Sequence, residues 1–170
     1  MVSVGAFCIV LVVLTTVIHY EVLRLLNTGL PGMQVPARTK LILVIIGTFL
    51  AHAAEIFLYA AAFYVLSRYL GAGMLGDAGR SSPLALSLYF SAETYTSLGY
   101  GDVVPGGDLR LLAGMEALNG LLLIGWSASY TYIAMERFWC NGDEENAIVI
   151  DRNSATAGMQ AARTLAKSVG

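Results

Sequence analysis

Long stretches of hydrophobic residues, rather than short alternating patterns, dominate this chain. Three of them are long enough to cross a bilayer as helices, which takes roughly 20 apolar residues. They run from about residue 2 to 26, from 40 to 66 and from 108 to 138. The first has no Lys or Arg in residues 1–20, and a cleaved signal peptide would carry basic residues there, so we expect this span to be retained. The pattern predicts an all-α membrane protein.

A fourth apolar segment lies between the second and third spans and is too short to cross a membrane. A Gly- and Ser-rich connection from Gly71 leads to Pro83, which is well placed to start a helix, and residues 84–95 make about three helical turns. The segment continues directly into Thr-Ser-Leu-Gly-Tyr-Gly-Asp at residues 96–102. Non-helical backbone at membrane depth is tolerated only inside protein or along a water-filled path. The order predicts a re-entrant pore loop.

The glycines of this loop suit a special backbone geometry. Turning successive carbonyl groups to one side requires alternating left- and right-handed dihedrals, which Gly99 and Gly101 tolerate because they lack a Cβ. A row of such carbonyls can replace the water shell of a dehydrated K⁺ ion. Tyr100 is then expected to point outward into surrounding protein. Taken alone, the tripeptide is equally typical of a glycine-rich surface turn, so its surroundings decide between the two.

Composition and charge narrow the class of protein. The chain is 56% hydrophobic and only 13% charged, against about a quarter charged in soluble domains. The net charge of −2 argues against nucleic-acid binding. Cys8 and Cys140 match no metal or disulfide spacing and are expected to be inert. No span carries the regularly spaced arginines of a voltage sensor.

Residues 40 to 138 resemble the two-helix pore module of tetrameric potassium channels. The resemblance rests on the segment Tyr89 to Ser97, which is similar to the pore helix of the family, on the Gly-Tyr-Gly motif, and on Asp102 and Pro105. The sequence departs from the family at Ser97, usually Thr, and at Leu98, usually Val or Ile. Serine keeps the hydroxyl, whereas leucine is less stiff than a β-branched residue. The resemblance implies a pore-loop cation channel fold with one additional N-terminal transmembrane helix.

The implied organisation has four parts. These are an N-terminal transmembrane helix (1–28), a cytoplasmic linker (29–39), a potassium channel pore domain (40–138) and a short cytoplasmic tail (139–170), in which a weak helix is expected over residues 154–169. The pore domain would contain an outer helix (40–69), a pore helix (84–95), a selectivity filter (97–101) and an inner helix (108–138). Residues 97–101 are called the predicted filter below.

The resemblance also implies a function. The chain is expected to be a non-enzymatic, multi-pass subunit of a K⁺-selective channel in the cell membrane, with lipid and K⁺ as partners, no nucleic acid, and no cofactor besides the permeant ion. K⁺ would bind at Ser97, Leu98, Gly99 and Tyr100. One filter per chain implies a homotetramer. A weakly selective monovalent cation channel and a non-conducting accessory subunit are the alternatives. The filter mouth and the N-terminus are expected outside the cell.

Three carboxylates are expected to support the filter. The resemblance implies that Glu93 and Asp102 meet behind it and share a proton, with Tyr89 as a possible hydrogen-bond partner. The alternative is that Glu93 accepts hydrogen bonds from backbone amides nearby. Glu116 is expected to face the back of the pore helix, since carboxylates in membranes are normally buried in protein.

Two glycines of the inner helix are candidate gating hinges by the same resemblance, Gly120 first and Gly125 second. Glycine also permits close contact between helices in membranes, and that alternative stays open. Leu122, Ser129 and Ile133 are candidates for lining the cavity below the filter.

His52 and Glu55 lie three residues apart in the second span and therefore share one helical face. They form either a pH-sensitive contact to His19 or Thr16 of the first span, or a satisfied structural pair. A zinc site is not expected, because the only two histidines come from different helices and no cysteine lies in register.

Overall fold

The structure is a computed structural model that describes residues 2–76 and 82–168, with side chains described for residues 4–76 and 82–138. Over these ranges the chain forms four helices: α1 (Val2–Gly29), α2 (Ala37–Arg68), α3 (Pro83–Tyr95) and α4 (Leu109–Ser168). Three stretches of helix are long and apolar enough to span a membrane, namely Val4–Gly29, Ala37–Arg68 and Leu109–Phe138. The fold is all-helical, as the hydrophobic pattern predicts.

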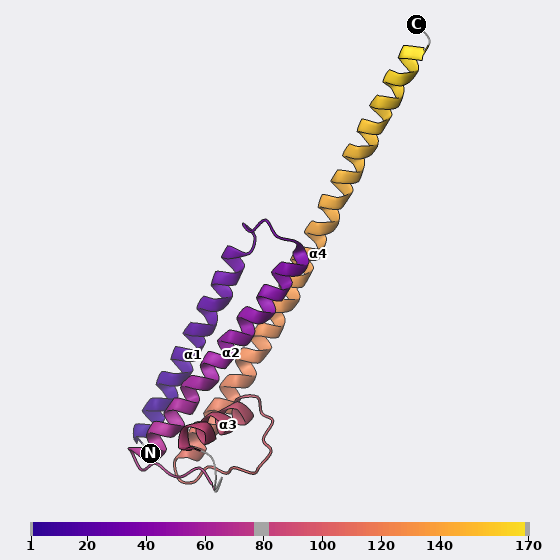
Figure 1. Cartoon of the computed structure of the whole chain (residues 1–170). Coiled ribbons are helices and arrows are strands. Elements are labelled where there is room, and N and C mark those ends of the chain that lie inside the picture. Colours follow the sequence, from indigo (N-terminus) through magenta and orange to yellow (C-terminus); the bar gives the residue numbers. More distant parts are fainter. Residues whose placement is uncertain (1, 77–81, 169–170) are drawn as a thin grey trace.

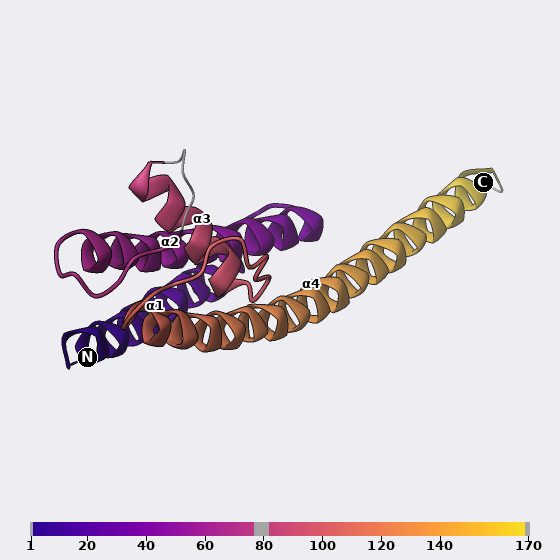
Figure 2. The same ribbon diagram turned by 90° about the horizontal axis from the view of Figure 1, so that it is seen from below.

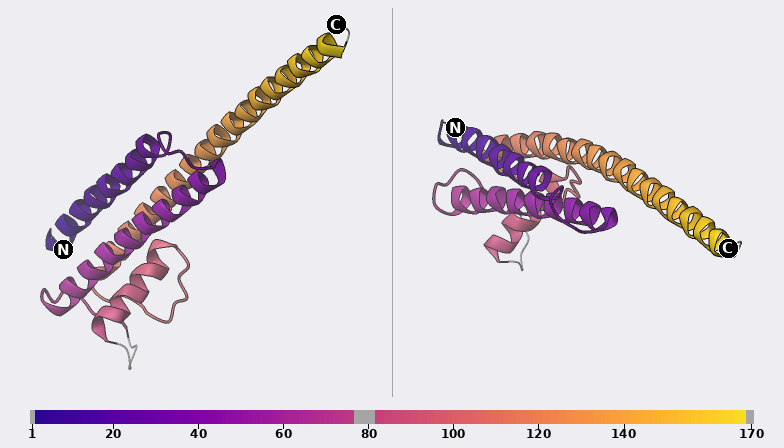
Figure 3. Two further views of the ribbon diagram at one scale, coloured as in Figure 1. Left: turned by 45° about the horizontal axis from the view of Figure 1, so that its top comes forward. Right: turned by 90° about the horizontal axis from the view of Figure 1, so that it is seen from above.

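The spans form a bundle with α3 at one end. Figure 1 shows α1, α2 and the first half of α4 side by side, with α3 at the end where the N-terminus lies. Both views of Figure 3 place α1 and α3 on opposite sides of α2. The additional first helix therefore packs against α2 and α4 and leaves the predicted filter uncovered.

The start of α3 follows from its sequence. Pro83 occupies the first turn, and the Ser82 hydroxyl accepts a hydrogen bond from the Ala85 amide at 3.3 Å. Proline has no amide hydrogen to satisfy at this position, and serine is a favoured cap. The predicted start of a helix at Pro83 is confirmed.

The main hydrophobic core surrounds α3 and joins it to the three spans. The rings of Phe63 and Phe90 meet edge to face, with centroids 5.0 Å apart, a favourable aromatic arrangement. The buried residues of this core come from all four helices and the segment before α4: Val4, Cys8, Leu11, Tyr59, Ala62, Phe63, Leu66, Phe90, Tyr95, Val103, Leu109 and Leu112. The short helix is therefore held by α2 and α4 of its own chain, and α1 belongs to the same core through its contacts with these two helices.

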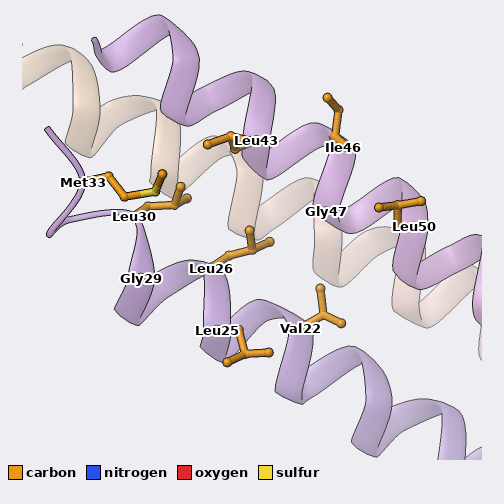
Figure 4. Close-up of a pocket in the computed structure, with 10 residues that line it drawn as sticks. All are labelled: Val22, Leu25, Leu26, Gly29, Leu30, Met33, Leu43, Ile46, Gly47 and Leu50. Atoms are coloured by element: carbon orange, nitrogen blue, oxygen red, sulfur yellow. The ribbon is translucent and has the colours of Figure 1, made fainter. Parts of the chain in front are cut away.

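The opposite end of the bundle has a smaller core of Leu30, Val44, Ala134 and Phe138. Close to it, α1 and α2 diverge around an open groove lined only by apolar residues and glycine, which Figure 4 shows in close-up. Such a lining offers no ligand to an ion. The groove suits the hydrocarbon of a membrane and is not part of an ion path.

The two segments that flank α3 pair with each other. Gly76 donates to the Val104 carbonyl at 3.0 Å, and Gly106 donates to the Met74 carbonyl at 2.8 Å. A Cβ on Gly73 would lie 2.1 Å from the Gly106 carbonyl oxygen, so this close approach requires glycine. Residues 72–76, which the sequence suggests are a flexible connection, are therefore paired with the segment after the predicted filter; residues 77–81 lie outside the described part.

The last helix is longer than predicted. It runs unbroken from Leu109 to Ser168 and curves gently, as Figure 2 shows. The inner helix was expected to end near residue 138, and a separate weak helix was expected from residue 154 to 169. The structure has neither the end nor the gap, because residues 139–168 contain no proline to stop the helix; residue 169 lies outside the described part.

Candidate ion pathway and a buried polar cluster

The backbone of the predicted filter alternates in handedness. Ser97, Gly99 and Gly101 have φ angles of 57°, 54° and 79°, whereas Leu98 and Tyr100 do not have positive φ. The dihedrals predicted for the two glycines are confirmed. Ser97 extends the alternation by one residue, although its Cβ makes this conformation costly by about 1–2 kcal/mol.

Four successive amide groups of this segment point at the end of α3. Ser97 donates to the Thr94 carbonyl at 3.0 Å, and Leu98 and Gly99 donate to the Glu93 carbonyl at 2.9 and 3.3 Å. Tyr100 donates to Oε2 of Glu93 at 3.3 Å. In a trans peptide unit the C=O of the preceding residue points opposite to the N–H. The carbonyls of residues 96–99 are therefore directed away from α3.

The predicted filter is open on that side within one chain. Residues 96–101 are all exposed, and the two large ones, Leu98 and Tyr100, are 59% and 71% exposed. Tyr100 was expected to point into surrounding protein, but its own chain does not cover it. One strand also provides carbonyls on one side of an ion only. The segment is incomplete as a binding site in a single chain.

The expected contact between Glu93 and Asp102 is not present. Glu93 accepts the Tyr100 amide, while the Tyr89 hydroxyl donates to Oδ2 of Asp102 at 3.0 Å. Tyr89 is thus a hydrogen-bond partner of the pair, as anticipated, but each carboxylate has its own donor. A buried backbone amide must be satisfied, whereas two carboxylates repel each other, so the arrangement is the favourable one. The interpretation of Glu93 as an acceptor for nearby amides is confirmed.

Both acidic groups affect pKa values near the predicted filter. Burial raises the pKa of Glu93, the Tyr100 amide opposes this, and the negative charge of Asp102 adds to it. The hydrogen bond to Asp102 raises the pKa of Tyr89 to about 12. Tyr89 therefore stays protonated and remains a donor to Asp102 throughout the physiological range.

Glu116 faces α3 as expected. It is fully buried, and its Oε1 accepts a hydrogen bond from the hydroxyl of Ser91, which also lies 2.8 Å from the Ile56 carbonyl oxygen. Its Oε2 has no hydrogen-bond partner among the described residues. The contact joins α4 to α3.

Gly120 marks the closest approach of α4 to α3. A Cβ at this position would lie 2.2 Å from the Tyr95 carbonyl oxygen, whereas one on Gly125 would meet nothing within 4 Å. Close helix contact, the alternative to a hinge, therefore accounts for Gly120. Leu122, Ser129 and Ile133 are all exposed in the single chain, as residues lining a shared cavity would be.

A polar cluster lies buried between the four helices. Nδ1 of His19 is 2.9 Å from Oε1 of Glu55, and Nδ1 of His52 is 3.2 Å from Oε2. The Tyr95 hydroxyl donates to Oε2 of Glu55 and lies 2.8 Å from Nδ1 of His52. Nε2 of both histidines contacts the Ser127 hydroxyl, at 3.1 Å for His19 and 3.0 Å for His52.

The cluster answers one question left open by the sequence. Of the two residues proposed in the first span, His19 contacts Glu55, whereas the Thr16 hydroxyl donates to the Val12 carbonyl of its own helix. A zinc site was not expected because the two histidines come from different helices, but the structure brings both of them to Glu55. Their ring centroids are 5.0 Å apart.

Three residues that form buried hydrogen bonds between helices were not identified as candidates from the sequence. Tyr95 and Ser127 belong to the cluster, and Asn119 donates from α4 to the hydroxyls of Thr15 at 2.8 Å and Tyr59 at 3.2 Å. The signal was a polar residue inside an otherwise apolar span, since such residues normally find a partner within the protein. The sequence shows that Asn119 and Ser127 need partners but not which ones.

A family model described as an ion channel matches residues 41–137, more than half of the chain. Comparisons with curated proteins and with solved structures found no match. The matched residues include most of α2, all of α3, the predicted filter and nearly all of the membrane-spanning part of α4, but not α1. Together with the pore-loop fold and three apolar helices, this match shows that the chain is an integral membrane protein of the ion-channel family.

Proposed function

We propose that the protein is a potassium-selective channel subunit that conducts K⁺ passively. The observation that supports this most strongly is the backbone of residues 97–101. Its alternating dihedrals and the four amides held by the end of α3 give a row of carbonyls on one side. Such a row is the known chemical means of replacing the hydration shell of K⁺.

Each part of the site has a role in this proposal. The carbonyls of Ser97, Leu98, Gly99 and Tyr100 bind the ion, and Gly101 completes the alternation. Glu93 holds the Tyr100 amide, and Tyr89 holds Asp102 beside the mouth. The ion is cargo, and the proposal involves neither a resident cofactor nor an enzymatic reaction.

The exposed face of the predicted filter supports a homotetramer. An ion must be surrounded by carbonyls, yet one chain offers a single strand whose residues are exposed. Closed cyclic symmetry brings identical strands to one axis, and a potassium filter uses four. In the tetramer, neighbouring chains would also cover Tyr100.

The proposed location is the cell membrane, with the predicted filter facing outward. The connection between α1 and α2 lies at the end opposite α3 (Figure 1). Four basic residues then flank the inner face, against three on the outer side, so the placement agrees only weakly with the tendency of basic residues to stay inside. The inner ones are Arg24, Arg38, Lys40 and Arg137, and the outer ones are Arg68, Arg80 and Arg110. The N-terminus is then outside.

Weak selectivity among monovalent cations is the second candidate, and Leu98 favours it. This residue stands where the resembled family usually has Val or Ile, and it lacks their branch at Cβ, which stiffens the side chain. A filter with a mobile wall can adapt to a smaller ion. The two candidates agree on conduction and differ only on Na⁺.

Ion flux from purified protein in liposomes tests the proposal. We expect flux down a K⁺ gradient and little flux down an equal Na⁺ gradient, with empty liposomes as the blank. Comparable fluxes for both ions would favour the weakly selective channel. No flux of either ion from correctly assembled protein would exclude both and favour a non-conducting accessory subunit.

A further inference from the structure

The cluster around Glu55 has a geometry that suits a metal ion. His19 and Glu55 are fully buried, and the His52 side chain is 18% exposed. One ligand atom from each of these three residues lies within 4.8 Å of the others. Around a tetrahedral Zn²⁺, bonds of about 2.0–2.2 Å place neighbouring ligand atoms roughly 3.3 Å apart. The distance from each Nδ1 to the nearer Glu55 oxygen, 2.9 Å for His19 and 3.2 Å for His52, is close to that value.

Both histidines present the same nitrogen to the carboxylate. Nδ1 of His19 and Nδ1 of His52 lie 2.9 and 3.2 Å from the two oxygens of Glu55. The Tyr95 hydroxyl oxygen lies 2.8 Å from Nδ1 of His52 and is available as a fourth ligand atom. Two imidazoles, a carboxylate and a further oxygen form a donor set that suits Zn²⁺.

The outward nitrogens of the histidines share one partner. Nε2 of His19 and Nε2 of His52 lie 3.1 and 3.0 Å from the same Ser127 hydroxyl oxygen. A metal-bound histidine usually donates its other N–H to a polar group, which fixes the ring and its tautomer. Ser127 can accept from both rings, and both Nδ1 atoms are then free of hydrogen and available to a cation.

The cluster has fewer hydrogens than its contacts need. Five of its six contacts form a closed ring, from His19 to Glu55, Tyr95, His52, Ser127 and back to His19, and the sixth joins Nδ1 of His52 to Oε2 of Glu55. Each contact of the ring needs one hydrogen. With neutral histidines and an ionised Glu55, these five groups supply four hydrogens, one each from two imidazoles, the phenol and the serine hydroxyl. One contact then lacks a hydrogen, and a net negative charge stays buried at membrane depth, which is costly.

We propose that His19, His52 and Glu55 bind a divalent transition-metal ion of the Zn²⁺ class, with the Tyr95 hydroxyl in the fourth position and Ser127 as the residue that orients both imidazoles. The ion places positive charge beside the buried carboxylate and removes the need for hydrogens between the ligand atoms. It also ties α1 to α2 and to the last residue of α3, which lies two positions before Ser97. Metal binding at this site can be tested separately from ion conduction, because it is measured without ion flux.

Metal content tests this directly. The full chain is produced with an affinity tag that contains no histidine, purified in a mild detergent without chelator, and analysed by elemental mass spectrometry. We expect about one Zn²⁺ per chain, either as purified or after addition of Zn²⁺. Addition of Co²⁺ to metal-free protein should give the visible absorption of a tetrahedral site. Protein that holds neither ion under these conditions overturns the proposal and leaves an additional proton as the source of the fifth hydrogen.

Matched variants locate the ion. His19→Asn keeps a polar group near Glu55 but removes the imidazole, and it should lose bound Zn²⁺ while keeping the particle size of the wild type. Glu55→Gln should do the same, and Ser127→Ala should weaken affinity by about 10- to 100-fold. Glu21→Gln is the control, because this exposed residue pairs with Arg24 on the same helix as His19 and lies outside the cluster. Unchanged metal content in both His19→Asn and Glu55→Gln would overturn the assignment.

If Glu55→Gln fails to assemble, His19→Asn and the Co²⁺ spectrum still decide the matter. A tetrahedral spectrum that is present in the wild type and absent in His19→Asn supports the site. A spectrum of equal intensity in both proteins places the ion elsewhere and contradicts the proposal.

Discussion

The predicted filter and the polar cluster around Glu55 lie close together in the chain, because Tyr95 belongs to the cluster and the filter begins at Ser97. The two regions are nevertheless built in opposite ways. The filter is made of backbone groups from consecutive residues and is exposed in a single chain. The cluster is made of side chains from four helices, and it is buried within that same chain.

This difference indicates what each region needs. Carbonyl groups that face away from α3 have no hydrogen-bond partner among the described residues, and under the proposed function an ion and further copies of the chain complete them. The cluster needs nothing from another chain, because each of its residues has partners among the other helices. Changes at the filter should therefore affect conduction, whereas changes at the helix contacts should affect the stability of each subunit.

The largest expected effect is the loss of conduction on replacing a filter glycine. Gly101 has a φ of 79°, and a Cβ there opposes the alternation that places the carbonyls. We expect Gly101→Ala to abolish K⁺ flux from liposomes, and Gly99→Ala to do the same, while mass measurement still finds the assembled particle. Gly114→Ala is the matched control, because a Cβ there meets nothing within 4 Å. Flux at the wild-type level in an assembled Gly101→Ala protein would contradict the filter assignment.

The next effect concerns the joint between the two regions, where Gly120 packs against Tyr95. A Cβ at Gly120 would overlap the Tyr95 carbonyl, so Gly120→Ala should force α4 away from α3 and destabilise the subunit by about 1–3 kcal/mol. Thermal unfolding in detergent measures this. Gly125→Ala, whose Cβ has free space, should leave stability unchanged or raise it slightly. Equal stability of the two variants would show that Gly120 is not needed for packing and would favour its role as a hinge.

A smaller effect is expected from Glu93, which holds the Tyr100 amide. Glu93→Ala removes this acceptor and should change the duration of sustained K⁺ current more than Glu93→Gln, which keeps an acceptor. Burial raises the pKa of Glu93 in the folded protein, so the folded state favours the neutral carboxyl. Its contribution to stability is therefore greatest at low pH and falls as the pH rises from the unfolded pKa through the folded pKa.

The pH dependence separates the acid from its amide replacement. Thermal unfolding of Glu93→Gln should lack the part of the pH profile that Glu93 contributes, and its stability relative to the wild type should increase as the pH rises through that window. If currents and unfolding profiles are the same in wild type, Glu93→Gln and Glu93→Ala, then Glu93 does not support the filter.

The smallest effect is expected where α1 meets α4. Asn119→Leu removes the hydrogen bonds to Thr15 and Tyr59 and should cost about 0.6–1.7 kcal/mol, which are the average and the maximum for polar contacts between membrane helices. A double-mutant cycle with Thr15→Val isolates the contact between those two residues. Leu118→Ala, at a position that is 55% exposed, provides the control. Strictly additive effects of the two substitutions would show that this contact contributes nothing.

The filter depends on consecutive residues and the cluster on side chains from four helices, and this difference also explains what the sequence could predict. The left-handed glycines, the start of α3 at Pro83 and the orientation of Glu116 were predicted because each depends on residues close in sequence or on the general rule that membrane carboxylates face protein. The ring of contacts through Ser127 was not predicted, because it depends on the rotation and depth of three helices about their own axes. Hydrophobic length fixes neither of these.

Two errors have specific physical causes. The expected contact between Glu93 and Asp102 came from the family resemblance, but the Tyr100 amide and the Tyr89 hydroxyl offer each carboxylate a better partner. The end of the last helix was placed near residue 138 because hydrophobicity ends there. Helix formation depends on the backbone and on helix-forming residues rather than on hydrophobicity, so α4 continues.

The unbroken length of α4 has a mechanical consequence. With a rise of 1.5 Å per residue, its part beyond residue 138 extends roughly 45 Å past the predicted span. A continuous helix carries rotation and displacement along its axis. The part of α4 near the membrane contacts α3 at two places: Gly120 packs against Tyr95, and Glu116 accepts a hydrogen bond from Ser91. A displacement of the far part would therefore pass along the continuous helix to the turns of α4 that contact α3.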